Sequence, residues 1–111
     1  MNKSRFKLTK GSSLTQPYHF VLKAPNNETI LNSENYTTKD AALNGIASVK
    51  VNSQSVKNFE IKTATNNEKY FILKAQNGQP IGTSETYSSE QMCKHGINAV
   101  MKYALNSETE E

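Results

Sequence analysis

The chain has 111 residues, of which 35% are hydrophobic and 21% are charged, and its formal net charge is +3. This length allows one domain, and the single cysteine excludes an internal disulfide bond and a cysteine-based metal site. No stretch approaches the roughly 20 apolar residues of a membrane-spanning helix, and no apolar run follows the amino-terminal residues. We therefore expect a cytoplasmic protein without a signal peptide or a membrane segment.

The first half of the chain predicts three strands and a helix. Apolar and polar residues alternate over residues 5–10, the pattern of a half-buried strand, and residues 18–24 place Phe20, Leu22 and Ala24 on one face of a second strand. A third strand that carries Ile30 is expected over residues 28–34, and a polar loop and an Asn-containing turn separate the three strands. Residues 37–40 resemble a capping box, in which a hydroxyl residue caps the helix and an acid follows three residues later. Ala42, Ile46 and Val49 then repeat at helical spacing, and the helix is expected to end near residues 51–53.

The second half predicts the same order of elements. Strands are expected over residues 58–63, 69–75 and 80–85, with the hairpin signal Asn77-Gly78 between the last two. Residues 88–91 again resemble a capping box, and Cys93, Ile97 and Val100 follow at helical spacing. We expect Cys93 to be a core residue. Residues 106–111, which include three of the ten acidic groups, are expected to form a disordered acidic tail.

The two halves are repeats of each other. When the chain is shifted by 51 residues, 12 of the 31 positions between 20 and 50 are identical. Units of about 50 residues are close to the limit for burying a core alone, so the halves are expected to share one. We predict an α+β fold in which two tandem β-β-β-α repeats, 1–54 and 55–105, form a single antiparallel sheet with two helices packed on one face. The clearest match sets Phe20-Val21-Leu22-Lys23-Ala24 against Phe71-Ile72-Leu73-Lys74-Ala75.

Besides the strand motifs above, the chain contains Ser33-Glu34-x-Tyr36, Gly45-Ile46, Asn77-Gly78, Ser84-Glu85-x-Tyr87 and Gly96-Ile97. These motifs, taken together, resemble the YegP-like family of small bacterial proteins of unknown function. The resemblance covers about residues 5–104 and rests on the strand motifs above and on further motifs in both repeats. It implies a single sheet built from two units, with a further strand after each helix that is exchanged between the units. It implies no activity and no cofactor, so no catalytic, cofactor-binding or metal-binding residue is carried over.

Two pairs of repeated residues have a chemical and a structural interpretation. Glu34 and Glu85 have the chemistry for acid–base catalysis, but we favour a structural role in which each carboxylate accepts backbone N–H bonds where a strand turns into a helix. Gly45 and Gly96 lie in the middle of helices, where glycine costs about 1 kcal/mol against alanine. We expect close approach of each helix to the sheet or to the other helix, because a phosphate site would need glycine at a helix start.

The sheet face opposite the core is the candidate functional surface. A solvated face, a protein-docking surface and a site for single-stranded nucleic acid are the alternatives, since interleaved lysines and aromatic residues can hold phosphates and bases. We predict a non-enzymatic structural or interaction module with no cofactor and an unidentified protein partner, and weak nucleic-acid binding is the alternative. The free sheet edges allow either a monomer or a weak homodimer. The residues of this surface are Lys7, Val21, Lys23, Lys62, Tyr70, Ile72 and Lys74.

Overall fold

The computed structural model describes residues 3–111; Met1 and Asn2, which the first repeat was expected to include, lie outside the described residues. The two α-helices are α1 (Lys39–Asn52) and α2 (Glu90–Tyr103), and a short 3₁₀ helix, η1 (Val56–Asn58), follows α1. Neither α-helix of the described residues is long and apolar enough to cross a membrane. The strands are β1 (Arg5–Lys10), β2 (Tyr18–Lys23), β3 (Thr29–Ser33), β4 (Phe59–Thr63), β5 (Lys69–Lys74), β6 (Pro80–Thr83) and β7 (Glu108–Glu110).

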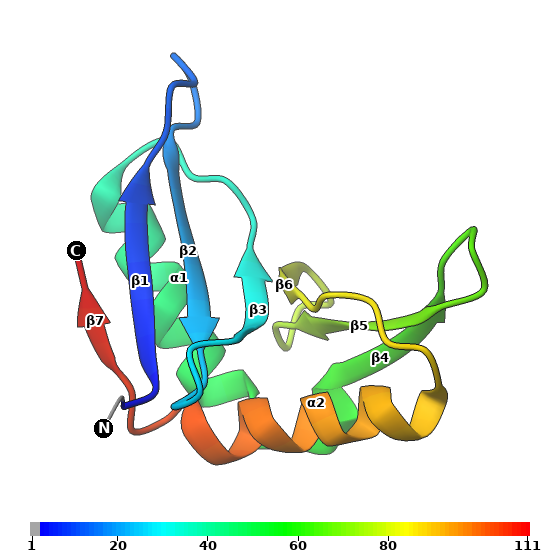
Figure 1. The fold of residues 1–111 in the computed structure, drawn as a ribbon. Helices are drawn as coiled ribbons and strands as arrows, with labels where there is room; N and C mark the ends of the chain where they lie inside the picture. Colours follow the sequence, from blue (N-terminus) through cyan, green and yellow to red (C-terminus); the bar gives the residue numbers. More distant parts are fainter. Residues whose placement is uncertain (1–2) are drawn as a thin grey trace.

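All seven strands of the described residues form one sheet in the order β4-β5-β6-β3-β2-β1-β7. Each half contributes an antiparallel meander, and tight turns in which Asn27, Asn67 and Gly78 adopt positive φ connect strands within the meanders. The meanders join where β3 pairs antiparallel with β6, so the sheet is continuous across the two halves. The strands of the first half run at a steep angle to β4 and β5 (Figure 1).

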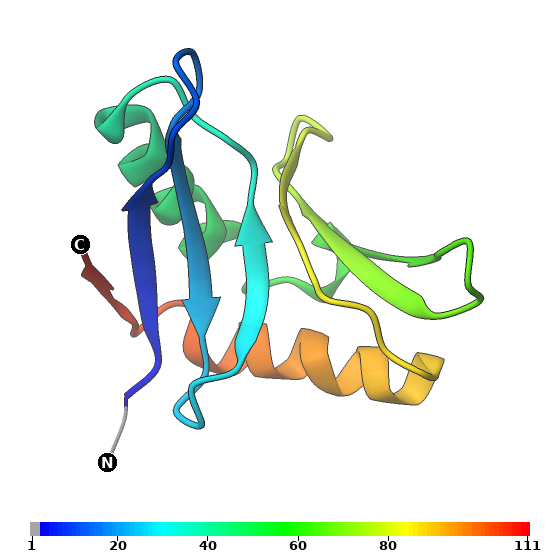
Figure 2. The same ribbon diagram turned by 45° about the horizontal axis from the view of Figure 1, so that its top comes forward.

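The core lies on one face of this sheet. Alternation along the strands buries Phe6, Phe20 and Phe71 completely, and the apolar stripes of both helices pack with these rings in one cluster. Helix α1 packs on β2 and also on β5 and β6, whereas α2 packs on β4 and β5 and also on β3. Figure 2 shows α2 running beneath both β3 and the second meander. Each helix therefore covers strands of both halves.

The carboxyl-terminal segment differs from the sequence prediction. Residues 108–110 form β7, which pairs parallel with β1, so the sheet is mixed and the predictions of a purely antiparallel sheet and of a disordered tail over residues 106–111 are wrong. Glu110 lies 3.7 Å from Arg5, and Glu111 pairs with Lys39. The tail thus covers the open edge of β1 with backbone hydrogen bonds and opposite charges, neither of which shows in its polar sequence.

Both helices also begin one residue later than a capping box requires. Thr38 and Ser89 are the N-caps, and their side-chain oxygens accept hydrogen bonds from the backbone N–H of Ala41 (3.0 Å) and Met92 (3.1 Å). Asp40 and Gln91 therefore lie two residues after the N-cap instead of three, and they do not form the reciprocal hydrogen bond of a capping box. Two residues before these caps, Tyr36 and Tyr87 still exchange backbone hydrogen bonds with β2 and β5.

Candidate functional site

The outer face of the sheet is the one that neither helix covers, and strand register orders the side chains on it. Cross-strand partners on one face form a row that crosses six of the seven strands. The row includes three of the seven residues predicted for the candidate surface, and the other four lie on the same face of β2, β4 and β5 by alternation. From β1 to β4 the row reads Lys7, Val21, Asn32, Thr83, Ile72 and Glu60.

Val21 and Ile72 occupy equivalent positions in the two halves, and both are partly exposed. Two strands lie between them, so they are about 14 Å apart at the usual strand spacing. Asn32 and Thr83 fill the intervening positions. The two branched residues thus form separate apolar points on a polar surface.

Ion pairs reduce the positive charge of this face. The Glu60 carboxylate lies 2.7 Å from the ammonium of Lys74 and 4.0 Å from that of Lys62. The hydrogen bond from Lys74, followed by the charge of Lys62, lowers the pKa of Glu60. Within residues 3–111, Lys7 and Lys23 of β1 and β2 form no ion pair, and the acidic residue nearest to Lys7 in the strand register is Glu110 of β7.

The repeated Ser-Glu-x-Tyr motif works differently from the prediction. The hydroxyl of Ser33 accepts the backbone N–H of Phe20 (2.8 Å) and donates to its neighbour's carbonyl, and Ser84 does the same with Phe71 (2.9 Å). Neither glutamate carboxylate accepts a backbone N–H bond in the described chain, and Glu85 instead accepts from the Asn32 amide across the junction of the two halves. The backbone-bonding role that we predicted for the glutamates therefore belongs to the serines.

The tyrosines of the motif explain the two glycines in the helices. Tyr36 stacks on Phe20 with ring centroids 6.0 Å apart, and a Cβ at Gly45 would lie 2.6 Å from the Tyr36 Cζ. Tyr87 lies over Gly96 in the same way, at 2.7 Å. The predicted close approach to the helix is present, but a tyrosine ring makes it.

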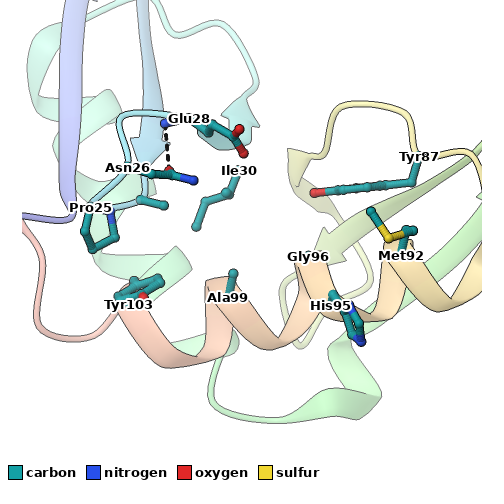
Figure 3. Close-up of a pocket in the computed structure, with 11 residues that line it drawn as sticks. Pro25, Asn26, Glu28, Ile30, Tyr87, Met92, His95, Gly96, Ala99 and Tyr103 are labelled. Atoms are coloured by element: carbon teal, nitrogen blue, oxygen red, sulfur yellow. Dashed lines mark hydrogen bonds between the residues drawn. The ribbon is translucent and has the colours of Figure 1, made fainter.

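A cleft that the sequence did not predict lies between the β2–β3 turn and α2, with a volume of about 390 Å³ (Figure 3). The Tyr87 hydroxyl points towards Ile30 across the cleft, while the imidazole of His95 points away from it. Burial raises the pKa of Tyr87, and the nearby Glu85 and Glu28 raise it further, so the phenol is neutral at physiological pH. The cleft is lined by Ala24, Pro25, Asn26, Glu28, Ile30, Tyr87, Met92, His95, Gly96, Ala99 and Tyr103.

Cys93 is completely buried, as predicted for a core residue, and burial raises the pKa of its thiol. Among residues 3–111, no group of three histidine, cysteine, aspartate or glutamate side chains lies close enough to hold a metal ion.

Comparison with known proteins places the chain in a family. Residues 16–60 and 64–111 each match the family described as Domain of unknown function (DUF1508). The chain belongs to this family. It is 54% identical over 90 residues to UPF0339 protein YegP of Yersinia pestis, a match that covers 81% of this chain and 80% of that protein.

Two solution NMR structures of family proteins share the fold. The UPF0339 protein SO3888 of Shewanella oneidensis superimposes with a TM-score of 0.87 at 44% identity, covering 97% of this chain and 90% of the other. The protein of unknown function yegP of Escherichia coli gives a TM-score of 0.88 at 44% identity, covering 99% and 93%. These relatives confirm the resemblance to YegP-like proteins, and their names assign no activity.

The matched segments are offset by one strand from the repeats that we predicted. Each begins before the second strand of a meander and runs through a helix into the next strand, so the first match spans β2, β3, α1 and the start of β4, and the second spans β5, β6, α2 and β7. Strand β4 leaves its own unit and pairs with β5 of the other. Strand β7 pairs with β1, which precedes the first unit.

Proposed function

We propose that the chain is a non-enzymatic cytoplasmic interaction module that binds a protein partner on the outer face of its sheet. The observation that carries this proposal is the uncovered row of side chains that crosses six strands and both halves. Partly exposed Val21 and Ile72 supply two apolar contacts on this surface. Because Val21 lies in the first half and Ile72 at the equivalent position of the second, a partner that contacts both residues binds both halves at once.

The charge of the surface indicates the chemistry of the partner. Lys7 and Lys23 carry positive charge that no acid of residues 3–111 pairs, next to the apolar contact of Val21. A face of this kind fits a folded protein that presents acidic side chains opposite β1 and β2 and apolar ones at its centre.

Binding of single-stranded nucleic acid is less well supported than protein binding. The ion pairs of Glu60 with Lys62 and Lys74 remove positive charge from the β4–β5 side, where the aromatic Tyr70 lies. A nucleic-acid groove needs its stacking residues and its free cations together. We expect a labelled single strand to show no binding at low salt.

The test is capture of partners from native cytoplasm by the immobilised full chain and by a Val21→Glu/Ile72→Glu variant. We expect the double variant to lose at least about tenfold of any partner captured, since buried charges oppose docking. The matched control is Val51→Glu/Leu105→Glu, which changes two apolar residues that are 68% and 51% exposed outside the sheet. Equal capture by all three proteins, or capture by none, would contradict the proposal.

A further inference from the structure

Strand β4 is an open edge of the sheet. It ends the strand order on one side, and no strand of the described residues pairs with its outer edge. Strand β1 holds the equivalent place in the other half, and there β7 covers the edge. An uncovered edge strand is a template for pairing with another chain.

Hydrogen bonds inside the sheet show which groups of β4 point outwards. The carbonyl of Phe71 accepts from the Ser84 N–H, and its own N–H donates to the Ser84 hydroxyl, both at 2.9 Å, so Phe71 directs its backbone groups away from β4. Ile61 lies opposite Phe71 and forms a non-hydrogen-bonded pair with it. The N–H and C=O of Ile61 therefore point out of the sheet edge, and those of Thr63 follow two residues along.

Apolar surface accompanies this edge on the helix side. A hollow of about 260 Å³ is lined by the side chains of Phe59 and Ile61, by Ile97 and Asn98 of α2, by Lys94 and by Val56, which is 64% exposed. Pairing at the edge would bring further apolar groups over this hollow. The edge thus offers both backbone hydrogen bonds and an apolar contact.

We propose that β4 pairs antiparallel with β4 of a second copy about a two-fold axis at Ile61. In this register the two Ile61 residues exchange both N–H···O bonds, and Phe59 lies opposite Thr63. Glu60 of each copy faces Lys62 of the other on the outer face, so the charges of the strand are self-complementary. The two hollows meet on the helix side, and the outer faces of both sheets stay open.

The charges at this edge favour β4 over the acidic tail of another copy. At the edge of β1, Arg5 and Lys39 pair with Glu110 and Glu111 of the tail. The repeat places Asn58 and Glu90 at the equivalent positions next to β4. The β4 edge thus lacks the counterparts of the two cations that hold β7. A strand with alternating charges, such as β4 of a second copy, therefore fits this edge better than an acidic tail does.

Sedimentation of charge variants tests the pairing. The five-residue strands form a small interface, so we expect a dissociation constant on the order of 100 µM for the unchanged chain. Lys62→Glu or Glu60→Lys alone places like charges opposite each other and weakens self-association about tenfold. An equimolar mixture of the two variants restores opposite charges at both contacts, and it should associate at least as well as the unchanged chain.

Amide exchange tests the register. The Ile61 N–H should exchange more slowly as protein concentration rises through the dissociation constant, whereas the amide of Phe6, at the edge that β7 covers, should not change. Ile61→Pro removes only an outward donor, so the monomer should stay folded and association should be lost. The proposal would be overturned if the charge variants left association unchanged, or if the Ile61 amide exchanged at the same rate at all concentrations. It would also be overturned if the edge paired with a foreign peptide but not with a second copy.

Discussion

Two tyrosines and two glycines hold the helices in place at equivalent points of the two halves. Each tyrosine ring lies between a core phenylalanine and a helix backbone, as Tyr87 does between Phe71 and Gly96. The ring is fixed because it stacks on the phenylalanine, and the tyrosine backbone is bonded to β5. A side chain on the glycine would therefore have to displace a ring that is stacked on the core.

This geometry predicts the sign of a Gly96→Ala substitution. In a helix free of other contacts alanine would stabilise by about 1 kcal/mol. Here we expect a loss of about 2 kcal/mol in the free energy of unfolding, measured by denaturant titration, because the new Cβ overlaps the ring. In a Tyr87→Ala background the same substitution should stabilise the protein.

Gly11→Ala is the control, since its Cβ would meet only the Pro17 carbonyl at 3.6 Å. Stabilisation by Gly96→Ala in the unchanged background would refute the packing role.

At the scale of residues, the sequence predicted a close contact to each helix at Gly45 and Gly96. Glycine in the middle of a helix lowers stability, and its presence in both repeats indicates a packing reason common to both. The sequence did not identify Tyr36 and Tyr87 as the groups that approach. Spacing along the chain does not tell which side chain reaches across a helix. The serines were missed for the same reason, since the partner of Ser33 is the backbone of Phe20 on another strand.

At the scale of elements, β7 is the least expected part of the fold. Its sequence is polar and acidic, and all of its residues are exposed. It forms because β1 presents unpaired backbone groups at the sheet edge and because Arg5 and Lys39 lie near Glu110 and Glu111. The strand is thus specified by its neighbour, whereas β1 and β2 are specified by their own alternation.

Removal of residues 108–111 tests this account of β7. We expect the truncated chain to fold, with a loss of about 1 kcal/mol from the backbone hydrogen bonds of the edge pair. The amide of Phe6 should exchange faster, while amides in β5 should change only with global stability. A Glu110→Gln/Glu111→Gln variant keeps the strand and removes its charges, so its effect should be smaller and sensitive to salt. An unchanged Phe6 amide in the truncated chain would contradict the pairing.

Strand and helix positions could be predicted well because each carries its own periodic pattern. The expected strand over residues 5–10 coincides with β1, and the expected helix end near 51–53 agrees with α1. For the candidate surface, the sequence predicted which residues lie on the outer face but not how their charges pair. The electrostatics of this surface depend on the cross-strand neighbours of Glu60 and on the docking of β7, which no local pattern records.

At the scale of the whole molecule, the two halves are joined by more than one sheet contact. The β3–β6 pair makes the sheet continuous, and each helix packs on strands of both halves. Buried side chains from both halves form a single cluster. Because units of about 50 residues bury little apolar surface alone, we infer that neither half is stable without the other.

The most direct measurement compares residues 1–54 and 55–111 as separate chains with their mixture, by NMR spectra and thermal melting. We expect each chain alone to give a collapsed spectrum and no cooperative melt as a monomer, because each helix has lost strands that it covers. The mixture should recover dispersed signals and a cooperative transition. A dispersed, cooperatively melting monomer of residues 1–54 would contradict the shared core.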